Sequence, residues 1–384
     1  MKSTTNSIER FFGRAIEKPP ETKLAPTQTD GKETGTVKRG IFFLLALFLV
    51  APLVSAQSRK PSTIAELAVY RGVDREQLLF AGAKGEGKIT WYTSLAGDSY
   101  KEMVKAFEAK YPGVKVESYR AAGAELVTRL QEEGKARRNI ADTIETTEGS
   151  LIFLRDEKLL RPYDSPQLDR YPEDGKERAD KNTVYWALAR ESYIGLTYNK
   201  TLVPKDAVPK NFDGLLHPQL KGKMGISIGQ TSDKIIGAML KTRSEEFVRK
   251  LKGQEIKLYS IEAPALVNNI AAGEIVASPA IFQTHTLLAA SKGAPVEWVP
   301  MDLVPTNVGS AAVAANPPHP HAALLMADFL LSPEGQKVLE KYYYGSGAKD
   351  YGFKKWRPEH GLTTEQYEKE LERWDKLLNS ITRK

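Results

Sequence analysis

Residues 222–240 constrain the fold more than any other stretch, because a strand pattern passes within a few residues into a helix pattern. Met224, Ile226 and Ile228 alternate with Gly225 and Ser227, which is the two-residue period of a β-strand. The apolar residues that follow recur at helical spacing: Ile235, Ile236, Met239 and Leu240. A strand that leads through a short loop into a helix is the unit from which parallel α/β sheets are built.

Gln230, Thr231 and Ser232 lie in the loop between this strand and this helix. Thr231 and Ser232 stand at the position of a helix N-cap, a role that suits hydroxyl side chains. A helix that starts at the carboxyl end of a strand presents N–H groups and the positive end of its dipole in the crevice where open α/β sheets bind ligands. We therefore predict that this loop binds an anionic group of a ligand.

The same stretch contains a formal G-x-S-x-G match at residues 225–229, which is the nucleophile-elbow motif of α/β hydrolases. In a true elbow the serine sits on the turn, with the helix directly behind it. Here the predicted cap lies four or five residues beyond Ser227, so Ser227 is expected inside the strand. A secreted serine hydrolase that uses Ser227 is therefore the alternative, and no catalytic activity is the expectation.

Strands and helices also alternate through the preceding part of the chain. The expected strands are 88–94, 114–119 and 141–146, and the expected helices begin at 99, 125 and 148. Sequences typical of capping boxes begin at Thr63, Asp74, Ser99 and Thr363. This order predicts an α/β fold whose mostly parallel sheets are flanked by helices.

The connection pattern changes near residue 190. Two strands, Val184–Ala189 and Tyr193–Tyr198, follow each other directly and are separated only by Arg190, Glu191 and Ser192. We interpret this break as the crossing into a second lobe, with residues 85–192 and 305–345 in lobe 1 and 193–304 and 346–384 in lobe 2. Because crossings line the cleft between lobes, Arg190 and Tyr193 are predicted ligand contacts.

The N-terminal region has the layout of a secretory signal. An uncharged apolar run over 41–54 follows Lys38 and Arg39 and ends in small residues before a predicted cleavage site after Ala56. Residues 37–56 are therefore a predicted signal peptide, and an uncleaved anchor is the alternative. Residues 1–36 are expected to be a disordered extension upstream of a translation start at Val37. Residues 57–84 are expected to form a helical arm.

Composition limits the chemistry of the mature chain. The absence of cysteine excludes disulfides and thiolate metal sites. Removing residues 1–56 lowers the formal net charge from +7 to +4, and no basic run is interleaved with aromatic residues. Nucleic-acid binding is therefore not expected, and no cofactor is predicted.

Several segments together resemble the extracytoplasmic solute-binding proteins of ABC importers, in particular the ferric-ion-binding branch. The segments are 89–94, 141–142, 159–162, 222–225, 272–274, 318–323 and 328–336. The resemblance implies a type II periplasmic binding protein fold, in which two lobes close on a ligand about a hinge. It also implies a periplasmic monomer that delivers a small molecule or ion to the transmembrane subunits of an ABC permease.

The resemblance also assigns ligand-binding positions. Gln230, Thr231 and Ser232 match the family's anion loop, and Glu148 matches a carboxylate ligand within one residue. Thr93 and Ser94 occupy the first loop, where ferric members often have histidine. The family's adjacent tyrosine pair falls on Gln283 and Thr284, just before His285. Without these phenolates no metal site is predicted, although Tyr193 or Tyr342–Tyr344 could offer a phenolate. The predicted ligand class is ferric iron, an iron chelate or a small organic anion.

Overall fold

The computed structural model describes residues 61–383, so the predictions for residues 1–60 lie outside it. Residues from Pro61 onward form one compact unit, which has the two-lobed architecture of type II periplasmic binding proteins. We define the lobes by their hydrophobic cores: clusters around Trp91 and Tyr92 mark the first lobe, and clusters around Ile226 and Ile281 mark the second. In the described part of the chain, no helix is long and apolar enough to cross a membrane.

The first lobe is built on three parallel strands, with β1 between β2 and β3. Its strands are β1 (Lys88–Thr93), β2 (Lys115–Arg120), β3 (Thr143–Thr147), β4 (Leu160–Arg161) and β5 (Lys176–Arg178). Its helices are α2 (Ile64–Ala68), α3 (Arg75–Glu86), α4 (Ser99–Lys110), α5 (Gly123–Lys135), α6 (Glu148–Asp156), α11 (Pro320–Leu331) and α12 (Pro333–Lys341). Parallel strands bring their carboxyl ends to one edge, so the loops after β1 and β3 lie side by side.

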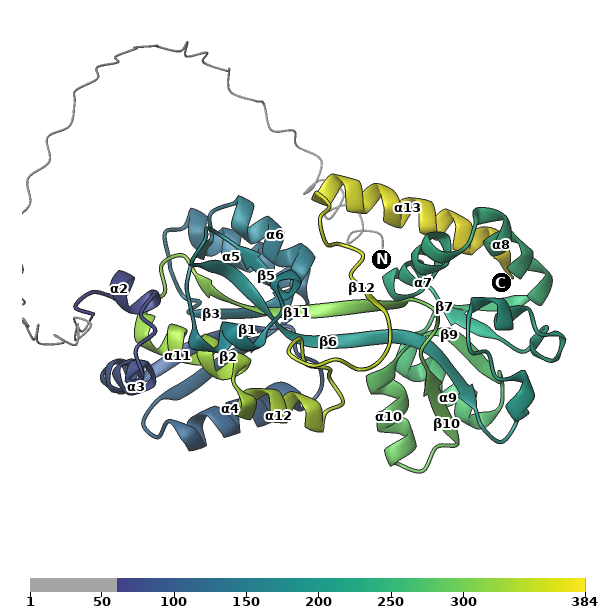
Figure 1. The fold of residues 1–384 in the computed structure, drawn as a ribbon, viewed down its shortest axis with the longest axis horizontal. Helices are drawn as coiled ribbons and strands as arrows, with labels where there is room; N and C mark the ends of the chain where they lie inside the picture. Colours follow the sequence, from purple (N-terminus) through teal and green to yellow (C-terminus); the bar gives the residue numbers. More distant parts are fainter. Residues whose placement is uncertain (1–60, 384) are drawn as a thin grey trace, which may run out of the picture. The chain divides into compact units, whose positions relative to one another are not determined.

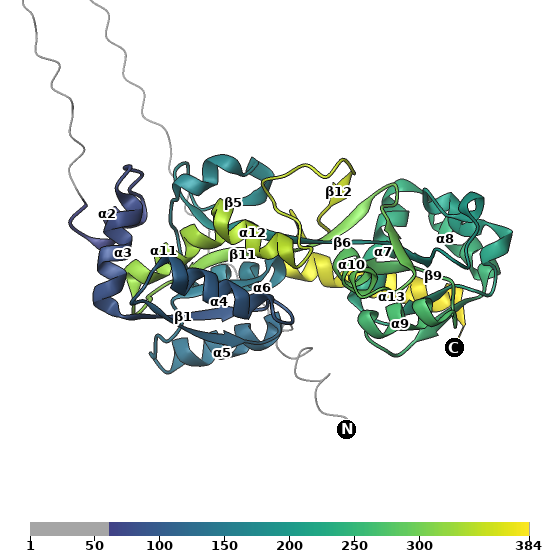
Figure 2. The ribbon, with the colours of Figure 1, turned by 90° about the horizontal axis from the view of Figure 1, so that it is seen from below.

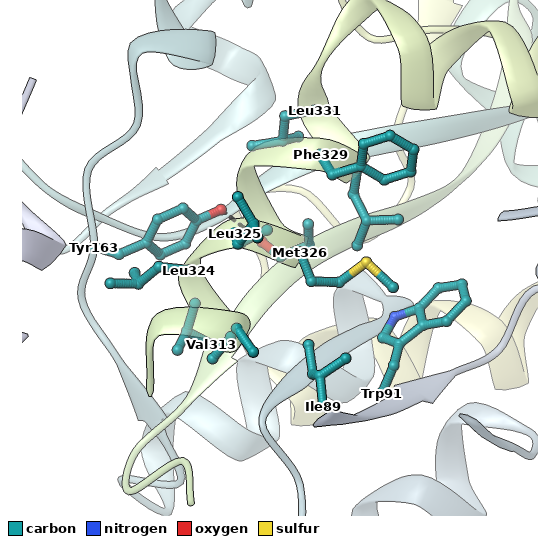
Figure 3. Close-up of a cluster of buried hydrophobic side chains, with 14 of the residues drawn as sticks. Ile89, Trp91, Tyr163, Val313, Leu324, Leu325, Met326, Phe329 and Leu331 are labelled. Carbon is teal, nitrogen blue, oxygen red and sulfur yellow. Dashed lines mark hydrogen bonds between the residues drawn. The ribbon is translucent and has the colours of Figure 1, made fainter. Parts of the chain in front are cut away.

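Alternation along β1 divides the first lobe into two layers of core. Ile89 and Trp91 are fully buried on the face covered by α3, α4, α11 and α12. Tyr92 points to the opposite face, against α5 and α6. Figure 3 shows Met326 of α11 directed toward Trp91, and Phe329 and Leu331 further along the same helix. Burial on both faces fixes the register of β1, because a slip of one residue would exchange the two sets.

The second lobe contains the strand–helix unit that the sequence predicts. Strand β7 (Gly225–Ser227) pairs in parallel with β8 (Ile256–Tyr259), and β8 pairs with β13 (Thr382–Arg383). The remaining elements are α7 (Gln230–Thr242), α8 (Glu245–Lys250), α9 (Ala263–Ala272), β9 (Ala277–Phe282), α10 (Gln283–Ser291), β10 (Val296–Val299) and α13 (Thr364–Ile381). Helices α7, α8 and α13 enclose one core, and α9 and α10 enclose the other.

Two long strands, β6 (Val184–Asn199) and β11 (Val304–Ala314), run side by side from one lobe into the other (Figures 1 and 2). The predicted break at Arg190, Glu191 and Ser192 is wrong, because β6 is continuous through these residues. Their polar groups are paired within the fold: Glu191 exchanges two backbone hydrogen bonds with Gly345, for example. Strands β6 and β11 pair mainly antiparallel with their neighbours, so the sheet contains both parallel and antiparallel pairs.

Several predicted helix starts differ from the structure. The capping boxes at Thr63 and Thr363 are confirmed. Asp74 is an N-cap without a side-chain hydrogen bond, and Ser99 lies inside α4, where its hydroxyl donates to the Ala96 carbonyl. The cap of α7 is Gly229, so the prediction of Thr231 or Ser232 as N-cap is wrong. Gly229 has φ 112°, a conformation that favours glycine, and it starts the helix two to three residues early.

Candidate ligand-binding site

A buried ion pair organises the lobe 1 side of the site. Arg190 donates through Nε to Glu145 Oε1 at 2.8 Å and through Nη2 to Ser94 Oγ at 3.1 Å. Thr93 donates from its hydroxyl to Glu145 Oε2 at 2.7 Å. Arg190 and Thr93 therefore meet at the Glu145 carboxylate, which is not among the predicted ligand contacts, and Ser94 lies beside them.

Glu145 and Arg190 meet across β11, which lies between their strands β3 and β6. The two side chains meet over Gly309 of β11, where a Cβ would lie 2.2 Å from Glu145 Oε1 and 2.7 Å from Arg190 Cζ. The Arg190 guanidinium also lies 5.3 Å from the ring centre of Tyr344. A glycine is thus required at position 309, because any side chain would displace the ion pair.

Glu148 is the first residue of α6 and is only 5% exposed. Burial raises the pKa of its carboxyl, and nearby Arg357 and His360 act in the opposite direction. Its Oε1 lies 3.6 Å from His360 Nδ1, and its Oε2 has no hydrogen-bond partner among residues 61–383. Glu148 therefore faces the C-terminal segment of the chain.

The lobe 2 side begins at the N-terminus of α7. Gln230 is exposed, Thr231 is half-buried, and no side chain caps the helix. The first N–H groups of a helix have no acceptor within it, so Gln230 and Thr231 offer donors to a ligand. Ser232 is turned inward, where its hydroxyl donates to the Ser227 carbonyl at 2.5 Å.

Charged residues follow immediately in the first turns of α7. Burial raises the pKa of Asp233 to about 7, with a smaller contribution from Asp375. Lys234 Nζ donates to Glu359 Oε1 at 2.7 Å, and both side chains are less than a tenth exposed. A lysine within an otherwise apolar helix pattern was the only sequence signal of this buried pair.

Tyr193 lies on β6 in an aromatic cluster. Its ring contacts those of Tyr351 and Phe353, and its hydroxyl donates to Glu191 Oε2 at 2.5 Å. Burial raises the pKa of this phenol, and the Glu191 carboxylate raises it further. Glu191 is in turn paired with Lys355 at 2.9 Å. The Tyr193 phenol is therefore neutral and already bonded.

Gln283, Thr284 and His285 form the first turn of α10, whose N-cap Phe282 makes no side-chain capping bond. His285 packs edge-on against Phe282, with ring centres 5.5 Å apart. Burial lowers the pKa of His285, and its Nδ1 lacks a hydrogen-bond partner within the described range. This turn offers neutral polar groups.

The structure also bears on the catalytic and metal alternatives. Ser227 lies within β7, is 6% exposed and precedes the helix by three residues, which is not the geometry of a nucleophile elbow. Between Pro61 and Arg383, no three His, Asp or Glu side chains are grouped so that they could hold a metal ion.

The chain was compared with known proteins. A family model described as bacterial extracellular solute-binding protein matches residues 102–352. No curated protein sequence matches the chain.

Three solved structures show the same fold. The spermidine/putrescine ABC transporter substrate-binding protein PotD from Streptococcus pneumoniae has a TM-score of 0.63 and 16% identity over 77% of this chain and 99% of that one. Iron-bound HitA from Pseudomonas aeruginosa has a TM-score of 0.57 and 22% identity, with coverages of 77% and 98%. The fructose-6-phosphate-bound protein AfuA from Actinobacillus pleuropneumoniae has a TM-score of 0.54 and 22% identity, with coverages of 77% and 97%.

Proposed function

Because the chain belongs to the bacterial extracellular solute-binding protein family, a non-enzymatic family that serves ABC transporters, we propose that it captures a small organic anion between its lobes for import. The N-terminus of α7 carries this proposal, since Gln230 and Thr231 present N–H groups that no side chain caps. On lobe 1 the half-buried Ser94 hydroxyl accepts from Arg190 and keeps its own O–H to donate to a ligand. A positive helix end with uncapped N–H donors favours carboxylate or phosphate over a cation.

The similar structures include proteins whose names refer to iron, a polyamine and a sugar phosphate, so the fold alone selects none of these. Direct ferric binding is the less favoured ligand class. Ferric ion requires several anionic oxygen ligands, whereas Gln283 and Thr284 are neutral and the Tyr193 phenol is held neutral by its raised pKa. A preloaded ferric chelate would still suit an anion site, because a chelate presents carboxylate groups.

The cellular setting follows from the family and the N-terminal sequence. The family is extracellular or periplasmic. We infer export through the signal at 37–56, action as a monomer, and delivery to the transmembrane subunits of an ABC permease.

The test is a thermal-shift screen of small carboxylates, phosphates, phosphonates and polyols, followed by calorimetric titration of each stabilising compound. Thr231→Pro removes one N–H at the second position of α7, where the ring is compatible with the helix start. We expect affinity to fall tenfold or more with little change in melting temperature. Glu246→Pro, at the second position of the surface helix α8, is the matched control and should leave affinity unchanged. Equal losses of stability and affinity in Thr231→Pro would show that the loop is only structural.

A further inference from the structure

The C-terminal segment between α12 and α13, residues 345–363, passes across both lobes, and we call it the strap. It begins at the backbone bridge between Gly345 and Glu191 and ends at the capping residue of α13. In its centre, strand β12 (Lys355–Trp356) pairs in parallel with Val304 and Pro305 at the start of β11. Figure 2 shows β12 beside the two long strands that connect the lobes. The strap is therefore attached where the lobes join.

Near its C-terminal end the strap contacts the first lobe through Arg357 and His360. Arg357 donates to the backbone carbonyl of Asp174 and lies 3.5 Å from its carboxylate. His360 lies 3.6 Å from Glu148. The His360 side chain is 45% exposed, whereas that of Glu148 is 6% exposed. Each of these two contacts therefore has one partner that is open to water, since the Asp174 side chain is 73% exposed.

The strap holds the second lobe through a buried charged pair. Glu359 accepts from Lys234 at 2.7 Å and from the Tyr367 hydroxyl at 3.2 Å. Trp356 packs edge-on against Trp374 of α13, and a Cβ at Gly237 of α7 would come within 3 Å of both rings. If Glu359 leaves, Lys234 stays buried in the fold as a charge without a partner, so this end resists release more than the other.

Neighbouring residues of the strap thus hold different lobes, since Glu359 binds lobe 2 and His360 binds lobe 1. The three residues that make these contacts, Arg357, Glu359 and His360, lie within a four-residue segment. A fully extended segment of that length spans only about 10 Å between its ends. The chain has little slack, and the lobes cannot move far apart while both ends stay bound. On separation the contacts to Glu148 and Asp174, each with one exposed partner, should break before the buried pair of Lys234 and Glu359, and this part of the strap should stay with lobe 2.

We propose that the strap is a latch that restrains lobe opening, with Glu359 and Trp356 as its anchor on lobe 2 and Arg357 and His360 as its catch on lobe 1. The proposal rests on lobe closure as the mode of ligand binding, which belongs to the proposed function. Glu148 connects the latch to the proposed function, because it is a predicted ligand contact and also the residue that His360 of the catch contacts. Ligand-free protein should therefore open less widely than the two connecting strands alone would allow.

Interlobe distances measured by paired spin labels test the latch. The chain has no cysteine, so Glu157→Cys and Lys252→Cys place one label on an exposed site of each lobe. The protein is unfolded and refolded to remove bound ligand. In this background, Arg357→Gln combined with His360→Asn should give a longer mean distance and a broader distribution. Lys369→Gln, which breaks an exposed pair with Glu365 on α13, also removes one positive charge, so it is the control and should leave the distribution unchanged.

Glu359→Gln should lengthen the interlobe distance in the same way. It also leaves Lys234 buried without its charged partner, which can unfold the protein. The catch variant leaves the buried pair of Lys234 and Glu359 intact, so it decides the question when its melting curve matches that of the parent. A folded catch variant whose distance distribution superimposes on the parent would overturn the latch. The measurement needs no ligand, so that result would leave the proposed function standing, whereas a protein that binds none of the screened anions would count against the function alone.

Discussion

Replacing Arg190 with methionine tests whether the buried pair with Glu145 organises the lobe 1 side of the site. The two side chains are 5% and 1% exposed and meet at 2.8 Å. Removing one partner of a buried pair costs about 3–5 kcal/mol, because the remaining charge stays buried without compensation. Thr93 still donates to Glu145 Oε2, which places the expected loss near the lower end, at about 3 kcal/mol.

That free energy converts into a measurable melting shift. The compact unit has roughly 320 residues, and an unfolding entropy of about 2.1 cal/mol/K per residue gives about 0.7 kcal/mol/K. A loss of about 3 kcal/mol should therefore lower the melting temperature by about 4 °C in calorimetry.

The double variant Arg190→Met with Glu145→Gln is the control for charge burial. It removes both charges and keeps an acceptor for Thr93, so it should recover more than half of the loss. A melting temperature within about 1 °C of wild type for Arg190→Met, or a double variant that loses the sum of the two single changes, would refute the reasoning.

Gly309→Ala should destabilise the protein by about 1–3 kcal/mol, because its Cβ would meet Glu145 and Arg190. Gly149→Ala in α6 is the control, since nothing lies within 4 Å of that Cβ, and it should be neutral or stabilising. Equal effects of the two changes in urea unfolding would contradict this prediction. Burial raises the pKa of Asp233 to about 7, so the fold favours the protonated form and its contribution, full near pH 4, is lost as the pH rises toward 7. Asp233→Asn should therefore gain stability relative to wild type over that range, by up to about 4 kcal/mol, and a pH-independent difference between the two proteins would refute the assignment. Titration with ferric citrate should leave the protein colourless and its melting temperature almost unchanged, whereas a visible charge-transfer band lost in Tyr193→Phe or Tyr343→Phe would contradict the ligand class.

The parts of the fold that sequence patterns predicted are those specified by local periodicity. The strands β1, β2 and β3 and the unit from β7 to α7 agree with expectation, because alternation and helical spacing are readable within ten to twenty residues. Exact helix starts were less predictable. Ser99 and Thr231 have the right chemistry for a cap, but the chain enters the helix one or more residues earlier.

The continuity of β6 could not be read from sequence, because its polar residues are satisfied by distant partners. Arg190 pairs with Glu145, 45 residues away, and Glu191 pairs with Lys355, 164 residues away. The contacts of the strap could not be predicted for the same reason, since Glu359 and Lys234 are 125 residues apart in the sequence. Charged residues within a predicted strand or helix, such as Glu145 and Lys234, were the signal that such partners exist.

The central claim is that the protein holds a small solute between its lobes, and native mass spectrometry of protein recovered from the envelope of producing cells tests it most directly. We expect a discrete mass increment in the native spectrum that disappears on denaturation. The increment should be reduced in Thr231→Pro and retained in Glu246→Pro. A native spectrum that shows only the bare polypeptide mass, before and after incubation with the screened carboxylates, phosphates, phosphonates and polyols, would contradict the claim.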